Sequence, residues 1–135
     1  MSTALKATFT ITSWDDRPER SVGDGPLLTR TKATQAYQGA ISGQGIVEYL
    51  MCAGADGWSH FVGFECITGT VDGRVGSFII EHVGVYSGEP RSQWTVVPGS
   101  GTGALEGIAG KGSYAASNGV MEVQFDYELL ERVRA

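Results

Sequence analysis

The chain has 135 residues with 41% hydrophobic, 19% charged and 20 glycine residues, a composition typical of one folded domain and not of a disordered chain. Its 15 acidic and 10 basic residues give a net charge of −5, and we expect no nucleic-acid binding because that needs a clustered basic surface. No apolar run approaches the ~20 residues that cross a bilayer, and the first residues show no secretory signal pattern. We therefore expect a cytoplasmic protein that does not bind membranes and whose two cysteines, Cys52 and Cys66, are reduced.

Short segments with β-strand character follow one another along the chain and are separated by Gly, Asp-Gly or Pro. The eight segments are 6–15, 27–38, 45–53, 58–71, 74–86, 91–97, 104–116 and 120–128. The polar stretch 16–26 is expected to be a loop at a barrel mouth, and 128–134 could form one or two helical turns. The pattern predicts a single all-β domain over residues 1–135, built as an antiparallel sandwich or barrel.

The Asp72-Gly73 pair is a strong signal for a two-residue hairpin turn, since both residues tolerate the positive φ of a type I′ turn. This turn pairs Val71 with Arg74. It also places His82 opposite Gly63.

The same rule applied to Asp56-Gly57 places Glu48 directly opposite Glu65. A four-residue turn would keep Glu48 on that face, whereas an odd-length loop or a bulge would move it to the other face.

The three middle segments then have two largely apolar faces. We expect the interior face to consist of Glu48, Leu50, Phe61, Gly63, Glu65, Ile67, Phe78, Ile80 and His82. We expect another subunit or another part of the chain to cover the outer face, which holds Val47, Tyr49, Met51, Val62, Phe64, Cys66, Ile79, Glu81 and Val83. This assignment puts Cys52 and Cys66 on opposite faces, and it predicts a homo-oligomer, most simply a dimer.

Glu48, Glu65 and His82 form the best candidate for chemistry. Two facing carboxylates cannot both ionise cheaply, so one would serve as general acid and the other as general base, with His82 assisting. The alternative is a structural polar cluster. A metal site is not expected because His60 falls on the opposite face from His82, and we expect no cofactor.

Pro98-Gly99-Ser100-Gly101-Thr102-Gly103 lacks the lysine and the following helix of a phosphate-binding loop, and it is expected to form a turn or a barrel corner. Ser100 has no nucleophile motif around it. The residues expected to line a ligand cavity are Leu50, Phe61, Phe78, Ile80, Trp94, Tyr114, Phe125 and Tyr127, where the face of Trp94 depends on the length of the preceding loop.

Four segments resemble a family of small bacterial proteins known only as a domain of unknown function: GIVEYLM (45–51), FVGFECITG (61–69), GSFIIEHVG (76–84) and WTVVPGSGTGALEGIAGKG (94–112). That family resembles the allene oxide cyclase-like β-barrels, which are related in architecture to dirigent proteins. The resemblance implies a closed eight-stranded up-and-down barrel with a lumen open at one end. It also implies cofactor-free cyclisation or isomerisation, or the binding of apolar small molecules, but it assigns no catalytic position.

Three functions fit these observations. The first is a cofactor-independent isomerase, cyclase or lyase that acts on a small apolar molecule through carboxylate chemistry. The second is a lipocalin-like barrel that binds a small molecule without chemistry. The third is a scaffold whose lumen is filled by its own side chains.

Overall fold

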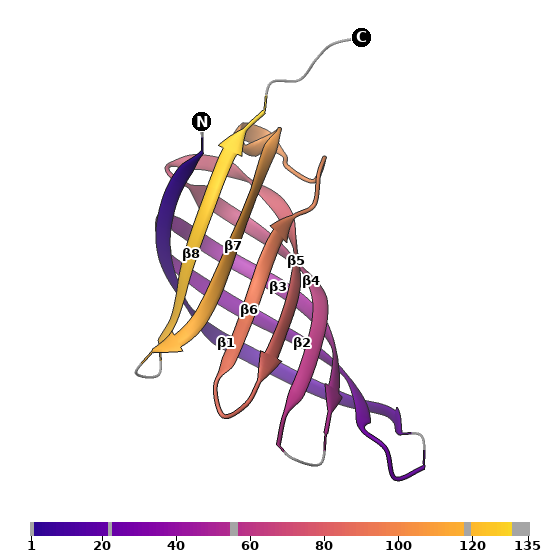
Figure 1. Ribbon diagram of the computed structural model, residues 1–135. Helices are drawn as coiled ribbons and strands as arrows, with labels where there is room; N and C mark the ends of the chain where they lie inside the picture. The colour runs from indigo at the N-terminus through magenta and orange to yellow at the C-terminus, as the bar shows by residue number, and fades with distance from the viewer. Residues whose placement is uncertain (1, 22, 55–56, 118–119, 131–135) are drawn as a thin grey trace.

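The computed structural model describes residues 2–21, 23–54, 57–117 and 120–130, which form one closed barrel of eight antiparallel strands (Figure 1). Each strand pairs with its neighbours in sequence, and β1 pairs with β8 to close the sheet. The strands are β1 (Thr3–Ser21), β2 (Leu27–Gly39), β3 (Ile41–Ala53), β4 (Ser59–Val71), β5 (Arg74–Tyr86), β6 (Pro90–Val96), β7 (Ile108–Ser117) and β8 (Val120–Leu129). The predicted eight-stranded up-and-down barrel is confirmed.

Three expected boundaries differ from the structure. The polar stretch 16–26 is not a loop over its whole length, because β1 continues to Ser21 and pairs there with β2. The segment 104–116 does not begin as a strand, because Gly103–Leu105 form a short 3₁₀ helix, η1. At the C-terminal end, β8 includes Glu128 and Leu129, and residues 131–134 of the expected helical turns lie outside the described residues.

The β4–β5 hairpin has the predicted register. Val71 pairs with Arg74, and Asp72 and Gly73 have positive φ angles of 52° and 80°, as a type I′ turn requires. His82 accordingly lies opposite Gly63.

The β3–β4 register was predicted wrongly. Ala53 pairs with Ser59, so a five-residue connection replaces the expected two-residue turn, and Glu48 lies opposite Phe64 while Glu65 lies opposite Val47. Because side chains alternate along a strand, this odd connection exchanges the two faces of β3. Glu48 and Leu50 therefore point outward, and Val47 and Tyr49 are buried in the barrel.

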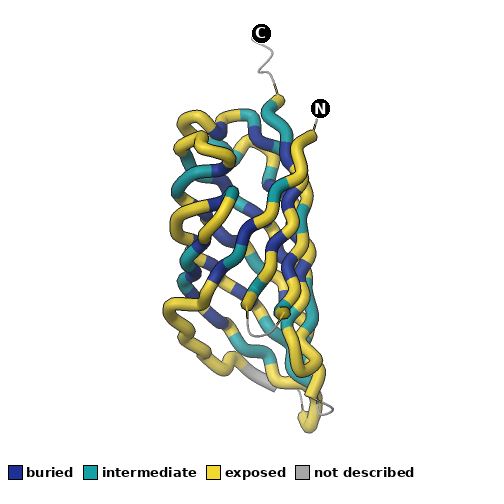
Figure 2. The backbone as a smooth tube through the Cα atoms, turned by 90° about the vertical axis from the view of Figure 1, so that its left-hand side faces the viewer, coloured by how far each residue is buried: buried dark blue, intermediate teal, exposed yellow. Residues whose placement is uncertain are grey.

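Buried and exposed residues alternate along the strands, so the core lies inside the barrel (Figure 2). One end is closed by the connection between β6 and β7, which places Leu105 in the core at 1% exposure. The Ser100 and Thr102 hydroxyls accept hydrogen bonds from the backbone N–H groups of Ile79 and Ser77, where β5 extends past the end of β6. The glycine-rich segment is thus a closing loop, in line with the expected barrel-corner role.

The outer wall over β3, β4 and β5 is apolar. Apart from Tyr86, six large hydrophobic side chains there are 42–66% exposed: Ile46, Leu50, Val62, Phe64, Val75 and Val83. The prediction that a second subunit covers this wall stays a prediction. Among the described residues, no helix is long and apolar enough to span a bilayer.

The prediction that the two cysteines face opposite ways is wrong, because the shifted register of β3 turns Cys52 to the same outer side as Cys66. Both are free thiols. Cys66 pairs with Ile46, six positions from Cys52 along β3, so distance along the strands keeps the thiols apart.

Candidate functional site

A fully buried carboxylate–imidazole pair lies near the middle of the barrel. Glu65 on β4 and His82 on β5 are both 0% exposed, and Glu65 Oε1 lies 2.6 Å from His82 Nε2. The β4–β5 register brings them together, since their cross-strand partners are Ile80 and Gly63 on the same inner face. Without a partner, either group would be costly to bury.

Side chains from β2 and β6 extend this pair into a hydrogen-bonded network. The other ring nitrogen, His82 Nδ1, lies 2.9 Å from Ser92 Oγ, and Tyr37 Oη donates to Glu65 Oε2 over 2.6 Å. Tyr37 Oη also lies 3.1 Å from the Gln35 side-chain oxygen. The Tyr37 hydroxyl thus donates mainly to Glu65 Oε2, the nearer acceptor, with the Gln35 side-chain oxygen as a second, longer contact.

A glycine on β3 makes room for the carboxylate. Gly45 faces the interior, and a Cβ atom there would overlap Glu65 Oε2 and press on the Tyr37 ring. The absence of this side chain lets β3 pass beside a buried glutamate and tyrosine. Gly45 therefore leaves room for the Glu65 side chain and takes no part in its hydrogen bonds.

The open end of the barrel holds a cavity of about 590 Å³, which we call the mouth. It lies at the end of the barrel where β5 ends and β6 begins and where β7 ends, opposite the end at which β1 begins and β8 ends (Figure 1). Its lining is mainly aromatic and aliphatic, and it consists of Phe9, Ile11, Trp14, Gln35, Tyr49, Met51, Ser59, Phe61, Tyr86, Gly88, Glu89, Pro90, Tyr114, Ala116 and Met121. A cavity of this size and character suits one small molecule.

The floor of the mouth separates the cavity from the buried pair. Tyr49 and Tyr114 both pack against the His82 ring, with centroid distances of 5.3 and 5.9 Å. Glu65 and His82 do not themselves line the mouth. A molecule in the mouth would meet tyrosine hydroxyls first and the Glu65–His82 pair one layer deeper.

The floor tyrosines are neutral hydrogen-bonding groups. Burial, together with the nearby Tyr114 and Glu65, raises the pKa of Tyr49 well above its usual value, and burial raises the pKa of Tyr114 to about 12. Burial is also the main cause of the raised pKa of Tyr37, and the nearby Glu65 is the next cause. Tyr49 Oη is buried and makes no well-formed hydrogen bond among the described residues, although Tyr114 and Gln35 lie close enough to influence its pKa. Trp94 Nε1, deeper in the core, also makes no hydrogen bond among the described residues.

The predicted site residues fall into three groups. Glu65 and His82 are brought together as expected, whereas Glu48 lies on the outer wall, so a pair of facing carboxylates does not exist. Of the predicted lining residues, Phe61 and Tyr114 line the mouth, and Leu50 is outside for the same reason as Glu48. The others are buried core residues that do not line the mouth: Phe78, Ile80, Trp94, Phe125 and Tyr127.

Several residues of the site were not predicted. Tyr49 was missed through the register error, and Gln35 and Tyr37 were missed although their alternation with Ala36 was visible in the Thr-rich segment. A bulge in β1 between Ile11 and Ser13 changes the parity of the strand, so that Trp14 lines the mouth together with Phe9. No turn or spacing signal in the sequence marks that bulge.

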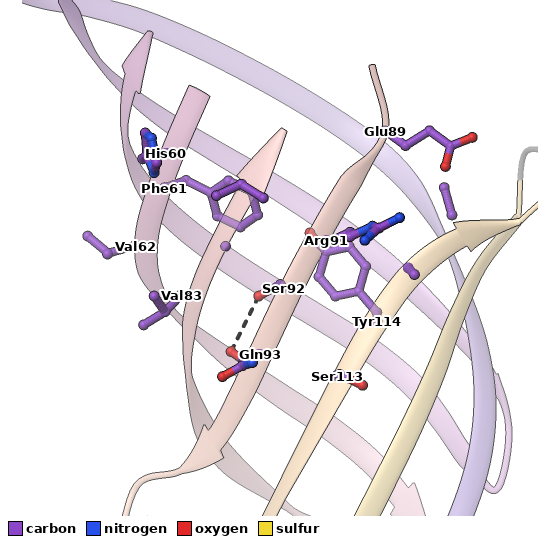
Figure 3. Close-up of a pocket in the computed structure, with 14 residues that line it drawn as sticks. His60, Phe61, Val62, Val83, Glu89, Arg91, Ser92, Gln93, Ser113 and Tyr114 are labelled. Carbon is purple, nitrogen blue, oxygen red and sulfur yellow. Dashed lines mark hydrogen bonds between the residues drawn. The ribbon is translucent and has the colours of Figure 1, made fainter. Parts of the chain in front are cut away.

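A second depression, of about 800 Å³, lies over β4 to β7 and involves Gly84 and Ser92 (Figure 3). A Cβ atom at Gly84 would overlap the Phe61 ring and the Arg91 carbonyl oxygen, so these groups pack directly against the backbone at this point. Ser92, which contacts His82, also donates to the carbonyl oxygen of Gln93 over 3.4 Å. Its side chain is directed to His82 and the backbone, and Ser92 is only 3% exposed.

Among the described residues, no group of three or more His, Cys, Asp or Glu side chains is arranged to hold a metal ion.

These features define a closed antiparallel barrel with a ligand-sized mouth above a buried polar network. The chain belongs to the family described as "protein of unknown function (DUF3224)", whose model matches residues 5–127. It is similar to the crystal structure of a protein with unknown function from the DUF3224 family of Shewanella oneidensis MR-1, with 26% sequence identity and a TM-score of 0.85. That similarity covers 97% of this chain and 100% of the other. No curated protein matches the sequence.

Proposed function

We propose that the mouth binds a small, largely apolar molecule that offers a polar group to the floor. The observation that carries this proposal is the buried Tyr49 hydroxyl at the base of a mainly apolar cavity, which makes no well-formed hydrogen bond among the described residues although Tyr114 and Gln35 lie close to it. A buried polar atom without a partner is costly, and a ligand hydroxyl or carbonyl group would supply the missing hydrogen bond.

The lining supports binding of one molecule with a defined orientation. Aromatic walls provide contact area, while Gln35, Tyr49 and Tyr114 place polar atoms at one end. This combination of an apolar wall with a few convergent polar groups is typical of small-molecule sites. The filled half of the barrel below provides a rigid base for it.

A matched pair of variants tests this proposal. Ala116 lines the mouth, and its neighbour Ala115 is exposed on the outer side of the same strand. With Nile red as a neutral fluorescent probe, we expect saturable binding to the native protein and at least a tenfold loss in Ala116→Phe. Ala115→Phe should bind as the native protein does. Equal binding by the two variants would place the probe outside the mouth and overturn the proposal.

The role of the floor hydroxyl has its own test. Tyr49→Phe keeps the ring and removes one hydroxyl, whose hydrogen bond is worth about 0.5–1.5 kcal/mol. We expect a two- to tenfold weaker affinity for an alcohol or ketone and an unchanged affinity for a hydrocarbon of the same shape, measured by displacement of Nile red.

A second candidate is catalysis, favoured by the 2.6 Å contact between Glu65 and His82 beneath the floor. A cofactor-independent isomerase, cyclase or lyase would use this pair to move a proton through the floor tyrosines, with one carboxylate in place of the two first expected. The likeness to allene oxide cyclase-like barrels belongs to this candidate. Catalysis predicts that Glu65→Gln abolishes turnover of a bound molecule while its affinity is retained, and loss of both together would contradict a catalytic role.

A further inference from the structure

The charged groups around the mouth are mostly negative. Glu89 is the only charged side chain among the described residues that line it. Asp16 stands nearby, because it accepts a 2.6 Å hydrogen bond from Thr31, whose hydroxyl also contacts Met51 of the lining. Glu65 lies one layer below the floor.

Two arginines of this end of the barrel are paired with carboxylates outside the mouth. Arg17 pairs with Asp15 at 3.4 Å, and Arg30 pairs with Glu19 at 3.0 Å. Arg91 does not line the mouth but lines the outer depression, which Glu89 also lines (Figure 3). His82 lies below the floor, 2.6 Å from Glu65, and does not line the mouth.

The rim also offers exposed aromatic surfaces. Trp14 and Tyr86 line the mouth and are 45% and 43% exposed, and the Trp14 ring lies 6.4 Å from the Tyr49 ring at 41°. The face of an aromatic ring attracts cations, most strongly for tryptophan. Tilted aromatic rings beside a carboxylate form the kind of surroundings that hold an ammonium group.

The mouth offers no positive side chain among its described lining residues to stabilise an anionic group. A carboxylate or phosphate loses hydration on entering an apolar cavity, and no lysine, arginine or histidine among the described lining residues would replace it. Glu65 and Glu89 would repel it. The floor hydroxyls can each donate one hydrogen bond, which does not offset the loss of hydration of a full charge.

We propose that the mouth selects molecules with an amine or quaternary ammonium group on an apolar body, held between Trp14, Tyr49 and Tyr86 and beside Glu89. This inference rests on the proposed function, since it specifies the class of molecule that the mouth binds.

Three compounds with the same chain test the inference: octyltrimethylammonium, octanol and octanoate. Each is titrated against the full chain loaded with Nile red, and displacement is followed by fluorescence at low ionic strength. We expect octyltrimethylammonium to bind at least tenfold more tightly than octanoate and more tightly than octanol. If octanol or octanoate binds as well as the cation, this inference is wrong while small-molecule binding stands. If Nile red itself fails to bind, the proposed function is wrong.

Variants assign the selectivity to the rim. Glu89→Gln and Trp14→Leu should each lower the affinity for octyltrimethylammonium three- to tenfold and leave octanol within twofold. Glu81→Gln, which removes an exposed carboxylate from the outer wall, is the matched control and should change neither affinity. Equal effects of Glu89→Gln and Glu81→Gln would show that only the net charge of the protein attracts the cation, and this would overturn the inferred site.

Discussion

The two ends of the barrel are built from the same strands but are filled differently. At the closed end, Phe78 and Phe125 stack with centroids 6.0 Å apart, and Leu105 of the β6–β7 connection fills the remaining space. At the open end, the inner side chains of the same sheet leave a cavity with hydroxyl groups at its base. The difference indicates that the closed end provides stability and the open end provides recognition, and mutations can separate these roles.

The largest expected effect is at the closed end. Phe78→Ala removes a ring that is 1% exposed and should lower the free energy of unfolding by about 3–5 kcal/mol. Trp14→Ala at the rim, where the ring is 45% exposed, should cost less than about 1 kcal/mol and instead weaken ligand binding. Urea unfolding of both variants measures this contrast, and similar losses of stability would contradict the division between the two ends.

The next largest effect on stability concerns the buried Glu65–His82 pair, which lies between the two ends. His82→Leu leaves the buried Glu65 carboxylate without its imidazole partner and should cost about 3–5 kcal/mol. The double variant Glu65→Leu, His82→Leu removes both groups, so it should be more stable than the sum of the two single losses predicts. A coupling of about 1–3 kcal/mol in this cycle is expected from direct contact, and additive losses would argue against the pair.

The buried tyrosines at the floor of the mouth and in the network below it should make the barrel sensitive to alkali. The pKa of Tyr114 is raised to about 12, and those of Tyr37 and Tyr49 are raised well above the ordinary value of about 10, chiefly by burial. Below about pH 10 both states keep these protons, so the stability from neutral tyrosines is fully present. From about pH 10 to 12 the unfolded chain loses protons that the folded barrel retains, so the free energy of unfolding falls by about 1.4 kcal/mol per pH unit for each tyrosine.

Urea unfolding at several alkaline pH values measures this slope, and tyrosinate absorbance reports ionisation directly. Tyr114→Phe serves as the control, because it removes one of the retained protons and should make the slope shallower by that amount. Complete tyrosinate absorbance at about pH 10 in a barrel that remains folded would contradict the prediction.

The sequence predicts the fold better than it predicts the site, and the reason lies in particular turns. Asp72-Gly73 specifies its own backbone geometry, so the position of His82 relative to Glu65 follows from local sequence. The connection 54–58 has no such rule, and one residue more or less exchanges Glu48 with Tyr49 at the interior face. The bulge in β1 likewise cannot be predicted from the local sequence, although it determines that Trp14 lines the mouth.

The smallest expected change in stability concerns the outer wall, where the two ends do not differ. We propose, as the sequence indicates, that a second copy of the chain covers the apolar surface around Phe64, which is 56% exposed. An isologous contact would bury this surface on both copies at once. Phe64→Asp should change the stability of the isolated barrel by less than about 0.5 kcal/mol, because the side chain is not part of the core.

Native mass spectrometry should show a dimer for the native chain and a monomer for Phe64→Asp, with Thr68→Asp on the same strand face as a control that remains dimeric. A monomeric native chain at micromolar concentration would remove the dimer from consideration and leave the outer wall uncovered, whereas ligand binding in the mouth would be unaffected by either result.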